Sequence, residues 1–142
     1  MKQIIYFFVF LMLAGLLSCR VEHLQSSAEP VKAINGTWQI IDASQNGTDL
    51  MSRFDFSKFR ITFTDSSYAI DSLLPFMVKT NGKWAFNDPQ YPFSITLTPT
   101  DSAAVTSPLT FPVVGGVRNM ILTFSPGCKA NTYQYTLRRS NQ

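Results

Sequence analysis

The stretch that decides the fold class is Phe59-Arg60-Ile61-Thr62-Phe63-Thr64-Asp65-Ser66-Ser67-Tyr68-Ala69-Ile70-Asp71. Apolar and polar side chains alternate on both sides of the Asp-Ser-Ser triplet. Strict alternation indicates a β-strand with one buried face, and the polar triplet between two such runs indicates a turn. We therefore predict a β-hairpin over residues 59–72.

The same pattern recurs along most of the chain. Further strands are expected over residues 37–41, 93–98, 120–124 and 133–137, and a hairpin over residues 76–86 with Asn81-Gly82 as its type I′ turn. Residues 51–58 fit either a strand or a short helical turn. Residues 105–114 contain Pro108 and Pro112, which favour an edge strand or irregular structure. Eight or nine short strands, with no amphipathic helix after residue 18, predict an all-β antiparallel barrel or sandwich.

The N-terminus has the features of an exported lipoprotein. Lys2 precedes an uncharged apolar run over residues 4–17, which is typical of a signal peptide and short for a membrane-spanning helix. Leu16-Leu17-Ser18-Cys19 then resembles a bacterial lipobox, where a signal peptidase cuts before cysteine and lipid is attached to the thiol. We predict a signal peptide at residues 1–18 and membrane attachment through acylated Cys19; the alternative is an uncleaved anchor helix.

Residues 19–32 are predicted to be a tether, because they are polar and lack periodicity. The domain is expected to span residues 33–142. If Cys19 is lipidated, Cys128 has no partner for an intrachain disulfide and is expected to be a small apolar side chain. The residues after Cys19 lack the aspartate that retains enterobacterial lipoproteins in the inner membrane, which favours the outer membrane.

The residues that most catalytic sites need are missing from the domain. Residues 30–142 contain no histidine and no glutamate, so a Ser-His-Asp arrangement or a histidine-based zinc site is excluded there. Phosphate-cradling glycine motifs and calcium-loop spacing are also absent. We therefore predict a protein that is not an enzyme and has no metal or cofactor. The net charge of +3 comes from scattered basic residues, so no nucleic-acid partner is expected.

Several short motifs together resemble one known family. They are Gly36-Thr37-Trp38, Phe54-Asp55-Phe56-Ser57, Ile61-Thr62-Phe63, Gly82-Lys83-Trp84, Asp88-Pro89 and Tyr133-Gln134-Tyr135. The chain resembles the small lipocalin-like lipoproteins of Bacteroidetes, a domain family of unknown function, over residues 33–139. The resemblance implies an up-and-down, lipocalin-like β-barrel or half-open barrel of about eight strands on a lipid tether, and it carries over no catalytic residue. Trp38 is expected to plug one end of that barrel.

Two functions remain open at this point. The barrel either binds a small apolar or amphipathic ligand, with Trp84, Tyr91 and Phe93 as candidate contacts, or acts as a structural or accessory envelope protein that binds a partner protein or polysaccharide. A ligand carrier should contain an apolar cavity of a few hundred cubic ångströms. An accessory protein should have a filled barrel and an exposed aromatic patch.

Two candidate modification sites complete the predictions. Asp71-Ser72-Leu73 and Asp101-Ser102-Ala103 resemble the sites at which exported Bacteroidetes proteins are O-glycosylated, which makes Ser72 and Ser102 candidates. Ordinary surface turns are the alternative for both.

Overall fold

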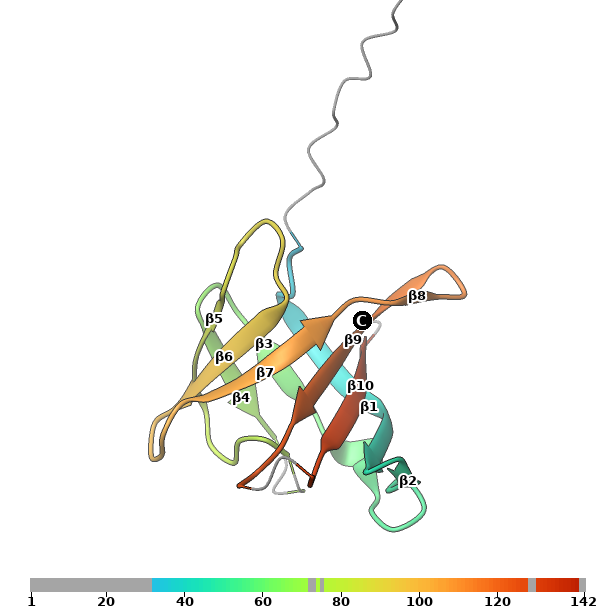
Figure 1. Ribbon diagram of the computed structural model, residues 1–142. Coiled ribbons are helices and arrows are strands. Elements are labelled where there is room, and N and C mark those ends of the chain that lie inside the picture. Colours follow the sequence, from blue (N-terminus) through green and yellow to red (C-terminus); the bar gives the residue numbers. More distant parts are fainter. Residues whose placement is uncertain (1–31, 72–73, 75, 128–129, 141–142) are drawn as a thin grey trace, which may run out of the picture.

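Eight antiparallel strands close into a barrel in the computed structural model, which describes residues 32–71, 74, 76–127 and 130–140 (Figure 1). The elements in chain order are β1 (Gly36–Gln45), β2 (Thr48–Asp49), the 3₁₀ helix η1 (Phe56–Lys58), β3 (Ile61–Phe63), β4 (Ser67–Ile70), β5 (Gly82–Phe86), β6 (Ser94–Pro99), β7 (Val105–Thr110), β8 (Val113–Val114), β9 (Val117–Phe124) and β10 (Tyr133–Arg139). The wall runs β10-β1-β3-β4-β5-β6-β7-β9, and β9 pairs with β10 to close it. The small strands β2 and β8 pair with β1 and β9 outside this ring. The predicted all-β, up-and-down barrel is confirmed.

The hairpin predicted over residues 59–72 is confirmed as β3 and β4. Phe63 pairs with Tyr68 across the turn, and Ile61 pairs with Ile70. Ile61, Phe63 and Tyr68 are buried, as the alternation predicts. The ambiguous segment before this hairpin forms η1, in which the Asp55 carboxylate caps the helix by accepting from the Ser57 amide.

The hairpin predicted over residues 76–86 is wrong. Only its second half is a strand, and that strand, β5, pairs with β4 and β6. A type I′ turn needs positive φ at both central residues, and Asn81 does not have it. Its side chain instead accepts from the Ile70 amide at 2.9 Å, which joins the segment to the end of β4. Phe76, Met77 and Val78 are buried against the core.

The barrel has two distinct ends. We call the end at which residue 32 leads into β1 the tether end; the turns and loops at residues 64–66, 87–93 and 111–116 lie there (Figure 1). Trp38 closes this end from within. Its indole Nε1 donates to the Ile34 carbonyl at 2.7 Å, and the Arg139 guanidinium lies 5.3 Å from the ring centroid. This arrangement confirms the structural role predicted for Trp38.

An aromatic cluster closes the opposite end. Phe56 of η1 and Phe76 both contact the ring of Tyr135, with centroid separations of 6.3 and 5.2 Å. Phe59 contacts Phe76 at 4.9 Å. Edge-on and tilted ring pairs of this kind stabilise a core beyond the area that they bury.

The interior between the two ends is filled by side chains. Inward-facing residues of the strands, including Ile61, Ile95, Leu97, Met120, Leu122 and Leu137, have 0% of their surface exposed. Within the described residues, these side chains are part of one buried hydrophobic cluster. Within the described ranges, no helix has the length and apolar character needed to cross a membrane.

Candidate functional site

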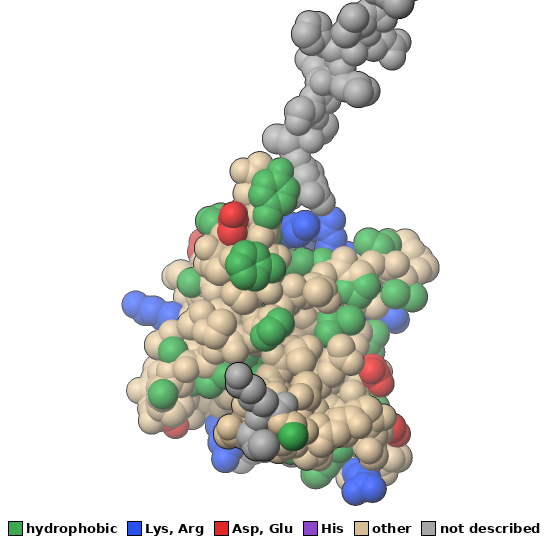
Figure 2. Space-filling model, viewed as in Figure 1, with side chains coloured by type: hydrophobic (Ala, Val, Ile, Leu, Met, Phe, Trp, Pro, Cys, Tyr) green, Lys and Arg blue, Asp and Glu red, His purple; other side chains and the backbone are tan. Residues whose placement is uncertain are grey.

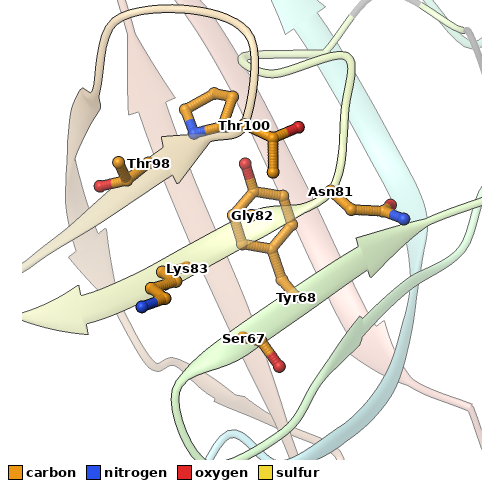
Figure 3. Close-up of a pocket in the computed structure, with 8 residues that line it drawn as sticks. Ser67, Tyr68, Asn81, Gly82, Lys83, Thr98 and Thr100 are labelled. Atoms are coloured by element: carbon orange, nitrogen blue, oxygen red, sulfur yellow. The ribbon is translucent and has the colours of Figure 1, made fainter.

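Because the described interior is filled, candidate sites lie on the outside of the barrel. One cleft has a volume of about 570 Å³ and lies where β4, β5 and β6 meet (Figure 3). Tyr68, Gly82 and Pro99 are aligned in register across these strands. Figure 3 shows the Tyr68 ring across Gly82, with its hydroxyl directed towards Thr100. Gly82 is required here, because an added Cβ would lie 2.1 Å from the carbonyl oxygen of Thr98.

The Tyr68 hydroxyl is the unusual group of this cleft. Tyr68 is only 3% exposed, and its hydroxyl has no hydrogen-bond partner among the described residues. Burial, with a smaller contribution from the charge of Asp101, raises the pKa of Tyr68 to about 12. A buried hydroxyl without a partner costs free energy, since it loses its hydrogen bonds to water.

The raised pKa of Tyr68 makes the domain sensitive to alkaline pH. The folded state holds the proton more tightly than the unfolded state, so the resulting stability is complete below the unfolded pKa near 10 and is lost as the pH rises towards 12. We expect Tyr68→Phe to reduce the fall in unfolding free energy over this range. Urea unfolding at pH 8, 10 and 11 measures this change. The same loss in wild type and variant would contradict it.

Tyr135 is a second buried tyrosine that makes the domain sensitive to alkaline pH. Burial, with Tyr133 nearby, raises the pKa of Tyr135 as well. Tyr68→Phe therefore leaves a residual alkaline loss.

Two further clefts lie at the tether end on either side of the segment that enters β1. One, of about 440 Å³, is lined by Lys32, Ala33, Ile34, Asn35, Asp65, Trp84, Ala85, Phe86 and Pro89. The other, of about 410 Å³, is lined by Lys32, Ala33, Trp38, Phe111, Gly116, Val117, Arg118 and Arg139. Both clefts include Lys32 and Ala33, so the β5–β6 loop and the β8–β9 hairpin flank the segment that leads into β1.

The three predicted contact residues are not brought into one site. Trp84 is half-buried and lines the 440 Å³ cleft, and its Nε1 donates to the Thr64 carbonyl at 2.7 Å. Tyr91 and Phe93 do not line that cleft; they are 58% and 69% exposed on the β5–β6 loop. The alternation predicts Phe93 on the inward face with Ile95, but Phe93 directly precedes β6 and its side chain is exposed.

The other predicted sites are placed only in part. Ser102 is exposed in the β6–β7 connection, where the neighbouring Asp101 carboxylate accepts from the Thr80 hydroxyl at 2.6 Å. Glycosylation of Ser102 stays a prediction. Cys19, Ser72 and Cys128 lie outside the described residues. Across the part of the chain that is described, no three histidine, cysteine or acidic side chains gather closely enough to hold a metal ion.

The described geometry is that of a filled barrel with surface clefts. A family model of a domain of unknown function, DUF5004, matches residues 19–138. The chain belongs to this family. No curated protein and no solved structure matches the chain. The function of this DUF5004 domain is therefore inferred from the barrel and its clefts.

Sequence reasoning missed two parts of these surfaces. Tyr68 was recognised only as an alternating strand residue, and nothing in its sequence context indicates an unpaired hydroxyl. Arg118 and Arg139 are far apart in the chain and meet only because β9 and β10 are neighbours in the wall. The exposure of Val113 and Val114 could have been predicted from the sequence, because these residues directly precede the Gly115-Gly116 turn.

Proposed function

We propose that this protein is a lipid-anchored lipoprotein of the cell envelope, with a non-catalytic, lipocalin-like barrel as an accessory domain. The apolar run over residues 4–17 and the lipobox that ends at Cys19 support the anchor. The DUF5004 match also begins at Cys19. The motif resemblance and the absence of an inner-membrane retention signal favour a Bacteroidetes outer membrane. No nucleic-acid partner is part of this proposal.

The filled barrel is the observation that favours an accessory domain over a carrier with an internal ligand. Carriers of small molecules enclose cavities of roughly 300–1,000 Å³. Many inward side chains of the described strands, such as Ile61, Ile95 and Leu97, instead belong to one buried hydrophobic cluster and are 0% exposed. The exposed Tyr91 and Phe93 supply the surface patch that an accessory protein requires.

Anchoring is tested by the mass of the mature protein. We expect the chain isolated from membranes to begin at Cys19 and to carry diacylglycerol on the thiol, with acyl groups at the new amino terminus. Two or three acyl chains are sufficient for stable anchoring. The Cys19→Ala chain is the control and should lack the lipid mass. An unmodified thiol at Cys19 in mature protein would overturn the proposed anchor.

Native mass spectrometry of the detergent-extracted lipoprotein separates the two functions. An accessory domain should retain only the mass of the acylated chain. A stoichiometric small molecule would favour a ligand carrier instead.

A ligand on the outer surface is the second candidate, and the 570 Å³ cleft favours it. This volume lies within the range of small-molecule sites, and the cleft combines the apolar Tyr68 and Pro99 with Ser67 and Lys83. Such a mixture suits an amphipathic molecule. If a small molecule copurifies, it should be lost from a Lys83→Ala variant and retained by an Arg118→Ala variant, because Arg118 lines a different cleft.

A further inference from the structure

Exposed apolar side chains are concentrated at the tether end. Of seven large hydrophobic residues exposed among the described residues, five lie there: Tyr91, Phe93, Val113, Val114 and Val117. We call these five the apolar rim. Figure 2 shows hydrophobic side chains at this end beside the place where the chain leaves the barrel, with Lys and Arg side chains between them. Clustered apolar exposure on a soluble domain indicates a contact surface.

The loops that carry the apolar rim are held in a fixed conformation. The Asp88 carboxylate accepts from the amides of Gln90 and Tyr91 at 2.8 and 3.0 Å. The Asn87 side chain accepts from the amides of Phe93 and Ser94 at 3.1 and 2.8 Å. These bonds present Tyr91 and Phe93 outwards. Exposure of the two rings is thus a property of an ordered loop.

Positive charge lies beside the apolar rim. Lys32, Arg118 and Arg139 line the 410 Å³ cleft together with Phe111 and Val117. None of the described residues that line this cleft is acidic. Cations bordered by apolar side chains match a bilayer interface, where anionic headgroups lie above acyl chains.

The position of the tether limits what the apolar rim can face. Twelve residues lie between Cys19 and Lys32, and the thirteen Cα–Cα steps that join these two residues span at most about 45 Å when fully extended. A lipid on Cys19 therefore keeps this end of the barrel close to the bilayer at high effective concentration.

We propose that the apolar rim docks on the bilayer itself, with Tyr91, Phe93 and the β8–β9 hairpin in the headgroup region and the basic cleft over anionic lipid phosphates. The proposal rests on the proposed function for the anchor alone. The rim then acts as a second membrane contact, which orients the barrel with its opposite end away from the surface. Tyrosine is suited to this depth, because its ring is apolar and its hydroxyl is polar.

Depth-dependent fluorescence quenching tests the docking. The purified lipoprotein is reconstituted into vesicles of phosphatidylethanolamine and phosphatidylglycerol whose acyl chains carry bromine, and the emission of Trp38 and Trp84 in the parent chain is subtracted. A Phe93→Trp reporter should lose about half of its emission, because a docked ring lies roughly 5–10 Å into the interface. Tyr91→Trp serves as a second reporter if Phe93→Trp fails to fold.

The matched control is Phe54→Trp. Phe54 is 39% exposed at the opposite end of the barrel, so a reporter there should not be quenched. Adding Arg118→Glu should lower the quenching of the Phe93→Trp reporter towards the control value, since it reverses one charge over the anionic surface. Equal quenching at positions 93 and 54 would overturn the proposal and would leave the rim to a partner protein.

Failure of the anchor and failure of the docking are distinguishable. A free Cys19 thiol in the mature protein overturns the anchor. The same reporters on that unlipidated protein, added to the vesicles from solution, then decide the docking alone. Quenching at position 93 but not at 54 supports it, and no quenching at either position overturns it.

Discussion

Trp38→Ala is expected to lower the free energy of unfolding by about 3–5 kcal/mol, the cost of removing a buried tryptophan from a packed core. Trp38 is 2% exposed and closes the tether end of the barrel. The change also leaves the Ile34 carbonyl without its donor and removes the ring beneath Arg139. Because small domains are stable by only about 5–15 kcal/mol, this loss is a large share of the total. Equilibrium urea unfolding, followed by circular dichroism, measures it.

Trp38→Phe separates the two contributions of this residue. Phenylalanine keeps most of the ring volume and loses the indole donor, so we expect a smaller loss, on the order of 1–2 kcal/mol. Equal destabilisation by the two substitutions would show that the packing of the ring adds nothing to stability and would contradict the role of Trp38 as a plug.

Gly82→Ala is expected to lower the free energy of unfolding by about 3 kcal/mol, at the upper end for overpacking. The added Cβ would lie 2.1 Å from the Thr98 carbonyl oxygen and 2.9 Å from Cα of Pro99. Both are backbone atoms of β6, so a side-chain rotation cannot relieve the overlap. The β5–β6 pairing must shift, and Tyr68, which lies across Gly82, must move with it. Urea unfolding and the near-ultraviolet circular dichroism of the aromatic residues report the two effects.

Gly115→Ala is the matched control for Gly82→Ala. Gly115 has a φ of +59°, and a Cβ there would have no neighbour within 4 Å. Only the left-handed backbone conformation then opposes the substitution, at a cost of about 1 kcal/mol. If the two alanine variants have the same stability, close strand approach is not what requires glycine at position 82.

The fold class was predictable because the local pattern and the tertiary structure agree. Alternation at residues 59–71 predicted β3 and β4 with their buried face. Asn46-Gly47, a dipeptide typical of tight turns, forms a turn in which the φ values are +49° and +78°. Asn81-Gly82 carries the same dipeptide but adopts no such turn. There the amide side chain of Asn81 binds the end of β4, and the burial of Phe76, Met77 and Val78 decides the path of the chain. An Asn-Gly dipeptide alone does not show whether its turn preference or the tertiary contacts around it will determine the conformation.

Pro108 shows a similar limit. Proline predicted an edge strand or irregular structure, whereas β7 is part of the barrel wall. The wall tolerates Pro108 because pairing between β7 and β9 covers only Leu109 and Thr110. Pro108 lies opposite Ser94 of β6, and the backbone hydrogen bond beside this pair runs from the Leu109 amide to the Phe93 carbonyl. The local edge character was correct, and the position of the strand in the closed ring depended on contacts that lie far apart in sequence.

The candidate surfaces were predictable only as single aromatic residues. The loop that carries Tyr91 is held by the side chains of Asp88 and Asn87, which accept from the amides of Tyr91 and Phe93. The grouping of its exposed rings with Val113, Val114 and two arginines depends on the closure of the barrel, which brings the β5–β6 loop and the β8–β9 hairpin to either side of Lys32. The β5–β6 loop and the β8–β9 hairpin are far apart in the sequence, so the sequence pattern does not predict that they are neighbours.

Closure of the wall between β9 and β10 has a further consequence for crowding. An open sheet ends in a row of unpaired amides and carbonyls, which recruits strands of neighbouring molecules and promotes aggregation. In the closed ring, these groups of β9 and β10 bind each other. A domain concentrated in two dimensions on a membrane meets its copies far more often than one in dilute solution. On the proposed membrane anchor, closure of the ring would leave the edges of β9 and β10 unavailable for pairing with neighbouring copies.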